Sequence, residues 1–227
     1  MKIVAGILLV FMTLACTNSF AENVVVEPTD RSIGNNLDLR AVASLFGQSE
    51  TLEDFENRLN NPDIGISNLD LNKDGHVDYL RVVEAVRNDT HLITIQAVLD
   101  KDLFQDVATI ELEQKSDKEV TAQIVGNDKI YGEDYIIRPA YPYIPIFSRL
   151  FRGPHYRPWR SPFFWGHYPQ NYRPWSPYSD ETYREHVQVH VNGGTMIRYS
   201  DGSSARMSVE TPKKGAPRVL GTRQLRK

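Results

Sequence analysis

Residues 70–84 read Asp70-Leu71-Asn72-Lys73-Asp74-Gly75-His76-Val77-Asp78-Tyr79-Leu80-Arg81-Val82-Val83-Glu84. The first nine of these residues, here called the aspartate loop, carry oxygen-bearing side chains at positions one, three, five and nine and glycine at position six. That is the ligand pattern of an EF-hand calcium loop. At position twelve, where an EF-hand supplies a bidentate Glu, the chain has a cation that cannot ligate calcium.

The aspartate loop therefore leads into a strand instead of the exiting helix of an EF-hand. We expect a calcium site formed by the side chains of Asp70, Asn72, Asp74 and Asp78 together with the carbonyl of His76. The same Asp and Gly chemistry also suits an ion-free turn, so the pattern leaves both readings open.

After the aspartate loop the apolar residues recur with a period of two. Residues 77–86 and 91–99 are typical of two strands joined by a polar turn, and pairing Arg87 with Thr90 puts one mostly apolar face together. This register brings Asp100 to the end of the hairpin where the loop lies. Asp100 is therefore a candidate for the missing calcium ligand, and its alternative role is to solubilise a turn.

Helical and strand patterns surround this hairpin. Apolar residues at helical spacing predict a helix within residues 37–46, and Thr51 is a predicted cap of a second helix that ends near residue 60. Alternation predicts further strands at 106–113 and 120–124. We expect an α+β head domain over residues 37–137, with two short helices packed on an antiparallel meander of four strands or slightly more.

Four strings follow one another in the head domain, at residues 68–84, 104–111, 123–126 and 131–137. In this order they resemble an uncharacterised family of exported bacterial proteins, which has an aspartate-rich, EF-hand-like loop before a β-meander and an aromatic tail. The resemblance implies an exported envelope protein and carries no known activity. It also implies that Arg81 belongs to the pattern.

The N-terminal residues predict export. Lys2, a short apolar run and small residues up to Ala21 are typical of a signal peptide over residues 1–21. The apolar run is shorter than the roughly 20 residues that span a bilayer, so we expect no transmembrane segment in the mature chain. The protein would be periplasmic or secreted, unless the only cysteine, Cys16, anchors it as a lipoprotein. Residues 22–36 would form a flexible leader.

Residues 138–183, here called the aromatic segment, differ in composition from the head. Residues 1–137 hold 11 Lys and Arg against 24 Asp and Glu, whereas residues 138–227 hold 15 against 5. Nine of the thirteen prolines and thirteen of the 23 aromatic residues lie within 138–179, which excludes regular helix and central strand and favours extended, irregular chain.

The aromatic segment suggests three roles. It could bind envelope glycans by stacking, settle among lipid headgroups, or lie along the acidic head or stay disordered. The candidate ligand contacts are Arg157, Trp159, Trp165, Arg173 and Trp175. Beyond it, alternation around Asn192-Gly193-Gly194 predicts a β-hairpin over residues 184–211, and residues 212–227 are expected to be a basic, disordered tail.

No nucleophile elbow, zinc-protease motif or phosphate loop occurs in the chain. The sequence therefore predicts an exported, non-enzymatic envelope binding or structural protein with a calcium-stabilised head. The alternatives are a metal-dependent envelope hydrolase and a protein-binding inhibitor or chaperone-like module. The expected partners are envelope glycan, lipid headgroups or an envelope protein, and export argues against nucleic acid.

Overall fold

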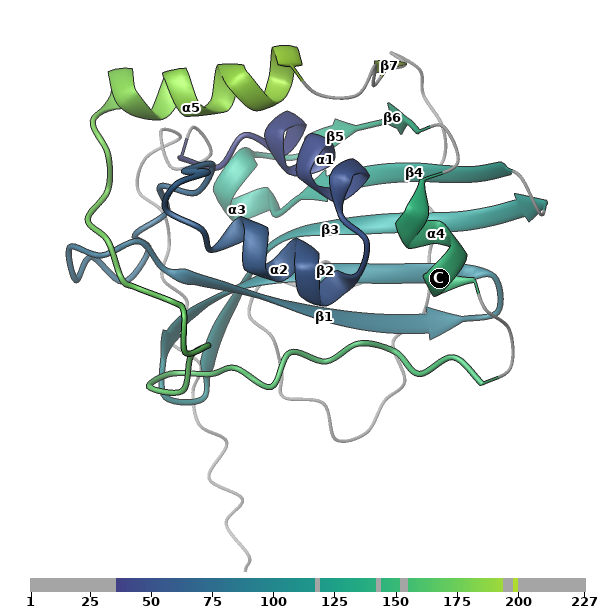
Figure 1. Cartoon of the computed structure of the whole chain (residues 1–227), viewed down its shortest axis with the longest axis horizontal. Helices are drawn as coiled ribbons and strands as arrows, with labels where there is room; N and C mark the ends of the chain where they lie inside the picture. Colours follow the sequence, from purple (N-terminus) through teal and green to yellow (C-terminus); the bar gives the residue numbers. More distant parts are fainter. Residues whose placement is uncertain (1–35, 117–118, 142–143, 152–154, 194–197, 200–227) are drawn as a thin grey trace, which may run out of the picture.

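A computed structural model of the chain describes residues 36–116, 119–141, 144–151, 155–193 and 198–199. The predicted signal peptide and basic tail lie outside these residues, as does the predicted leader except for its last residue, Asn36. The fold is α+β, with a five-stranded antiparallel sheet in the order β1-β2-β3-β4-β5 (Figure 1). The sheet strands are β1 Tyr79–Arg87, β2 Thr90–Asp100, β3 Leu103–Ser116, β4 Glu119–Gly126 and β5 Ile136–Ile137. The other elements are α1 Leu39–Gln48, α2 Leu52–Leu59, α3 Asp128–Tyr131, β6 Pro139–Ala140, α4 Pro145–Leu150, α5 Asp180–Gly193 and β7 Arg198–Tyr199.

The two N-terminal helices begin at side-chain caps. The Asp38 carboxylate accepts the Arg40 N–H before α1, and the Thr51 hydroxyl accepts the Asp54 N–H at 2.9 Å before α2. Such caps satisfy backbone donors that a helix start leaves unpaired. The predicted cap at Thr51 is confirmed.

The hairpin of β1 and β2 has the predicted register, since Arg87 lies opposite Thr90 and the pairing continues in phase to Tyr79 and Val98. One face of the sheet packs against α1 and α2, which lie in front of it in Figure 1. Between the two helices, the rings of Phe46 and Phe55 pack edge to face with their centres 5.3 Å apart. Its buried strand residues include Leu80, Val82, Ile93, Ile95, Ile110 and Leu112.

The outer edge of β1 is covered by groups from two other parts of the chain. After α2, the Asn60 side chain accepts the N–H of Leu80 and donates to its carbonyl, both at 2.7 Å. Farther along, the Trp159 carbonyl accepts the Glu84 N–H at 2.8 Å, where the aromatic segment runs beside β1 (Figure 1). An uncovered edge would expose unpaired backbone groups to association, and the aromatic segment prevents this.

The C-terminal hairpin prediction is wrong for the residues that the structure describes, because α5 is a helix and β7 pairs with β6. Residues 186–191 alternate in hydrophobicity, but they also continue a helical spacing that starts earlier. Tyr183 and Val187, four residues apart, are buried on one face of α5, and Asp180 and Glu181 suit the helix N-terminus. Residues 194–197 and 200–211 of the predicted hairpin lie outside the described part.

Where the structure describes it, the aromatic segment contains the short strand β6, the short helix α4 and, from Asp180, the first turn of α5. The exclusion of regular helix was therefore too broad. Pro145 lies in the first turn of α4, where a missing N–H removes no intrahelical hydrogen bond. Ile146, Phe147 and Leu150 of this helix are buried against the core.

Candidate functional site

The aspartate loop curls around the backbone N–H groups of its own centre. The Asp74 N–H lies 3.1 Å from Oδ1 of Asp70 and 3.0 Å from Oδ1 of Asn72, so these two side-chain oxygens converge. Oδ2 of Asp70 accepts the Gly75 N–H at 3.0 Å, and Oδ1 of Asp74 accepts the His76 N–H at 2.9 Å. Gly75 has a φ of 85°, a conformation that glycine adopts without strain and that the tight turn requires.

Asp78 closes the aspartate loop from its far end. Its Oδ2 accepts the Leu71 N–H at 2.6 Å, and only 5% of the residue is exposed. The pKa of the Asp78 carboxyl is raised to about 8, chiefly by burial; the Leu71 hydrogen bond opposes the shift, and the nearby charges of Asp70 and Asp74 add to it. The carboxylates of Asp70, Asp74 and Asp78 therefore lie within electrostatic reach of one another.

The calcium prediction fits part of this geometry. Asp70 and Asn72 bring oxygens to the same N–H group, and the Asn72 amide also donates to Oδ2 of Asp74 at 3.1 Å, so these residues would hold the ion. Within the described residues, however, no three His, Cys, Asp or Glu side chains gather as a metal-binding group. The site would therefore depend on the Asn72 amide oxygen and the His76 carbonyl as further ligands.

The predicted sixth ligand, Asp100, has a different contact. Its Oδ1 accepts the N–H of Lys101 at 2.7 Å, which is the turn-solubilising alternative. The aspartate loop does reach this end of β2, because Nδ2 of Asn72 donates to the Leu99 carbonyl at 3.1 Å. The imidazole of His76 is exposed, with its Nδ1 3.5 Å from Oδ1 of Asp74.

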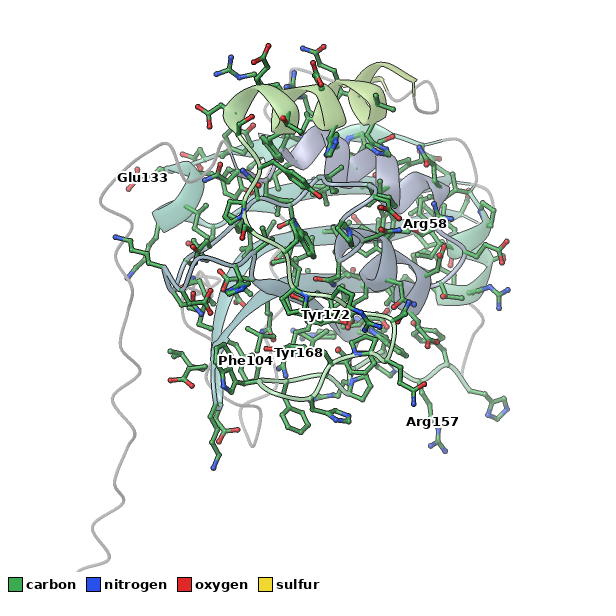
Figure 2. The ribbon with its side chains drawn as sticks, turned by 60° about the vertical axis from the view of Figure 1, so that its left-hand side comes forward. Arg58, Phe104, Glu133, Arg157, Tyr168 and Tyr172 are labelled. Carbon is green, nitrogen blue, oxygen red and sulfur yellow. The ribbon has the colours of Figure 1, made fainter. Side chains whose placement is uncertain are left out.

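A pocket of about 310 Å³ lies where the aspartate loop meets the aromatic segment. On one side the chain passes back over the loop, since the Val77 N–H donates to the Trp175 carbonyl at 2.8 Å. Behind the pocket, the Tyr79 ring lies 5.3 Å from that of Tyr168 and 5.0 Å from that of Tyr172. Figure 2 shows Tyr168 and Tyr172 side by side near the end of the sheet. The lining residues are Asp74, His76, Val77, Asp78, Tyr79, Val98, Trp165, Gly166, Tyr168, Tyr172 and Pro174.

The five candidate ligand contacts of the aromatic segment differ in location and exposure, and only Trp165 lines the pocket. Trp165 lines the pocket and is 38% exposed. Trp159 and Trp175 are half-buried, and the Trp175 indole N–H has no hydrogen-bond partner within the described chain. Arg157 extends into solvent (Figure 2). Arg173 is exposed and donates to two main-chain carbonyls of its own segment.

Sequence reasoning missed a role for Glu56, which is 1% exposed beneath the aromatic segment. Its carboxylate accepts the Tyr79 hydroxyl at 2.8 Å, the Val82 N–H at 2.9 Å and the Ser161 hydroxyl at 2.7 Å, and the Trp159 indole N–H lies 3.4 Å away. Burial raises the pKa of Glu56, while these hydrogen bonds, that of Ser161 foremost, oppose the shift. The available signal was that Glu56 follows Phe55 on the apolar face of α2.

Glu84 is a second buried carboxylate that the aromatic segment covers. It is 4% exposed, its Oε1 lies 2.5 Å from Nδ1 of His91, and its Oε2 accepts the Tyr156 hydroxyl at 2.6 Å and the Trp159 N–H at 2.8 Å. Alternation along β1 places Glu84 on the apolar face, which was the signal that it needed partners. The aromatic segment supplies donors to both buried carboxylates and is part of the packed structure.

None of the described helices is long and apolar enough to cross a membrane. Comparisons of the chain with protein-family models, with curated proteins and with solved structures find no match.

Proposed function

We propose that this chain is an exported, non-enzymatic binding or structural module of the cell envelope, whose head is stabilised by calcium in the aspartate loop. Its partner would be an envelope glycan, a lipid headgroup or an envelope protein. The proposal combines the predicted N-terminal export signal with the chemistry of the loop.

The convergence of oxygens in the aspartate loop is the observation that carries the calcium part of this proposal. Asp70 and Asn72 direct oxygens to the same N–H group, and Asp78 lies close enough to Asp70 and Asp74 for their charges to oppose its ionisation. A divalent cation among these groups would offset their repulsion and couple its binding to the stability of the fold.

The placement of two buried carboxylates, Glu56 and Glu84, supports a non-enzymatic role. Glu56 and Glu84 both accept several hydrogen bonds and connect the aromatic segment to the head. Neither lines the pocket. Their role is to hold two parts of the chain together, and they are not free to act as acid and base toward a bound substrate.

A thermal melt with calcium and with chelator tests the proposal. For the wild type, calcium at 100 times its dissociation constant stabilises by about 2.7 kcal/mol, and Asp74→Ala should lose most of that increase. Asp63→Ala is the matched control, because Asp63 is an exposed aspartate outside the aspartate loop. A calcium response that is absent in the wild type, or that persists unchanged in Asp74→Ala, contradicts the calcium site.

Fractionation of cells that express the full chain tests the predicted location. Export places the protein in the periplasm or medium, and a Cys16→Ala variant distinguishes a cleaved signal from a lipid anchor. If Cys16 carries lipid, the substitution moves the protein from the membrane fraction. Recovery of an uncleaved chain in the cytoplasm contradicts export.

A further inference from the structure

The pocket beside the aspartate loop combines acidic groups with aromatic rings. Asp74 and Asp78 line it from the loop, and Trp165, Tyr168 and Tyr172 line it from the aromatic segment. No Lys or Arg of the described chain is among its lining residues. Among the described residues, the basic group that lines it is the imidazole of His76, which is exposed, with its Nδ1 3.5 Å from Oδ1 of Asp74.

Asp78 is the most unusual of the lining residues. Only 5% of the residue is exposed, and its Oδ2 accepts a hydrogen bond from the Leu71 N–H. Within the described residues its Oδ1 accepts no hydrogen bond, and no Lys, Arg or His forms an ion pair with Asp78. Burial without a positive partner favours the protonated form of this carboxyl, and a cation in the pocket would favour its ionised form.

The aromatic rings suit the same kind of ligand. Aromatic faces carry negative potential and attract cations within about 6 Å, most strongly where water is excluded. Tyr168 and Tyr172 are kept in place by their contacts with each other, 5.0 Å between ring centres, and with the buried ring of Tyr79. Trp165 is more exposed and forms the outer wall.

We infer that this pocket binds a small organic cation, a quaternary or protonated amine, between the carboxylates of the aspartate loop and the rings of Trp165, Tyr168 and Tyr172. The inference rests on the proposed binding function and deepens it by naming the ligand class. At about 310 Å³ the pocket is at the small end of ligand sites, which suits one such headgroup and not an extended chain.

A neutral sugar is the competing ligand, because aromatic rings and carboxylates also bind sugars. A sugar could stack on Trp165 and donate hydroxyl groups to Asp74. It would bring no positive charge to Asp74 and Asp78, beside which no Lys or Arg of the described chain lines the pocket. The absence of a lining Lys or Arg therefore favours the cation.

Isothermal titration of the full mature chain with choline tests the inference, with chelator in one series and calcium in the other. The matched ligand is 3,3-dimethyl-1-butanol, which has the shape of choline without its charge. We expect choline to bind about tenfold or more tightly than this neutral analogue. Glucose serves as the neutral sugar.

Two neighbouring aromatic residues make a matched pair of variants. Trp165→Ala should weaken choline binding about tenfold, because it removes one wall of the pocket. Phe164→Ala should leave binding unchanged, since Phe164 is 50% exposed and stacks on His167 outside the pocket. Both side chains are exposed, so neither substitution should unfold the chain, and a thermal melt checks this.

The outcomes separate the two proposals. No choline binding in either series, equal binding of the neutral analogue, or preferential binding of glucose each overturns the cation inference. If the cation inference is overturned but calcium still stabilises the wild type and not Asp74→Ala, the proposed calcium site is unaffected. Choline binding that Trp165→Ala weakens and Phe164→Ala does not supports the inference, with or without a calcium response.

Discussion

Ser161→Ala tests whether the aromatic segment stabilises the head through its buried carboxylates. The Ser161 hydroxyl donates to Oε1 of Glu56 at 2.7 Å and accepts the Phe163 N–H at 3.2 Å. Alanine removes both contacts without adding volume. Because Glu56 is 1% exposed, water cannot readily replace the lost donor.

The size of the effect follows from the charge of the acceptor. A hydrogen bond to a charged group contributes about 1.5–3 kcal/mol, compared with about 1 kcal/mol for a neutral pair. We therefore expect Ser161→Ala to lower the free energy of unfolding by about 2 kcal/mol when Glu56 is ionised. The loss should be smaller when Glu56 is protonated.

The expected pH dependence has a definite sign. Burial raises the pKa of Glu56 in the folded state above its ordinary value, so the folded chain binds the proton more tightly than the unfolded chain. The contribution of Glu56 to stability is highest below its ordinary pKa and decreases as pH rises through the raised value. Ser161→Ala raises that pKa further, so its cost should grow as pH increases across this window.

Urea unfolding of the wild type and of Ser161→Ala, from about pH 5 to about pH 8, measures how the loss of stability changes with pH. Ser176→Ala is the matched control, because Ser176 is exposed and makes no hydrogen bond within the described chain. Glu56→Gln completes a double-mutant cycle that isolates the coupling between the two groups. A loss below about 0.5 kcal/mol at high pH, or one that does not change with pH, would refute the reasoning.

Two further substitutions probe contacts that join distant parts of the chain. Tyr183→Phe should lower the free energy of unfolding in urea by about 1–3 kcal/mol, because the Tyr183 hydroxyl accepts the Asp38 N–H at 3.0 Å and donates to the Ile66 carbonyl at 3.1 Å. Tyr135→Phe is the control and should leave stability unchanged, because the Tyr135 ring is exposed. Equal effects of the two substitutions would contradict this prediction. Arg81→Lys should lower the free energy of unfolding by about 1 kcal/mol, because the guanidinium lies 3.6 Å from the ring centre of Phe104 and its Nε–H donates to Gln96 at 2.8 Å. An unchanged unfolding midpoint would show that neither contact contributes to stability.

Much of the head domain could be predicted from short-range pattern. Thr51 before an acidic first turn indicates a helix start, and the four-residue turn from Arg87 to Thr90 sets the hairpin register. These signals are reliable because the interacting groups lie within a few residues of one another, so local geometry determines the pairing.

The end of the chain could not be predicted in this way. Alternation in residues 186–191 favours a strand, but helix α5 buries Tyr183 and Val187 and places the Tyr183 hydroxyl between Asp38 and Ile66. Those two partners precede Tyr183 by 145 and 117 residues. Contacts at such separation override local propensity, which is weak for short segments.

The sequence by itself determined the α+β class, the capped helix α2, the β1–β2 register and the curled form of the aspartate loop, because each depends on nearby residues. Only the tertiary structure placed Trp165 and Tyr172 around the same pocket as Asp78 and gave Glu56 and Glu84 their donors from the aromatic segment. An irregular segment has no periodicity from which its path can be predicted. Its position depends on which distant buried groups need partners, and that need arises only when the core has formed.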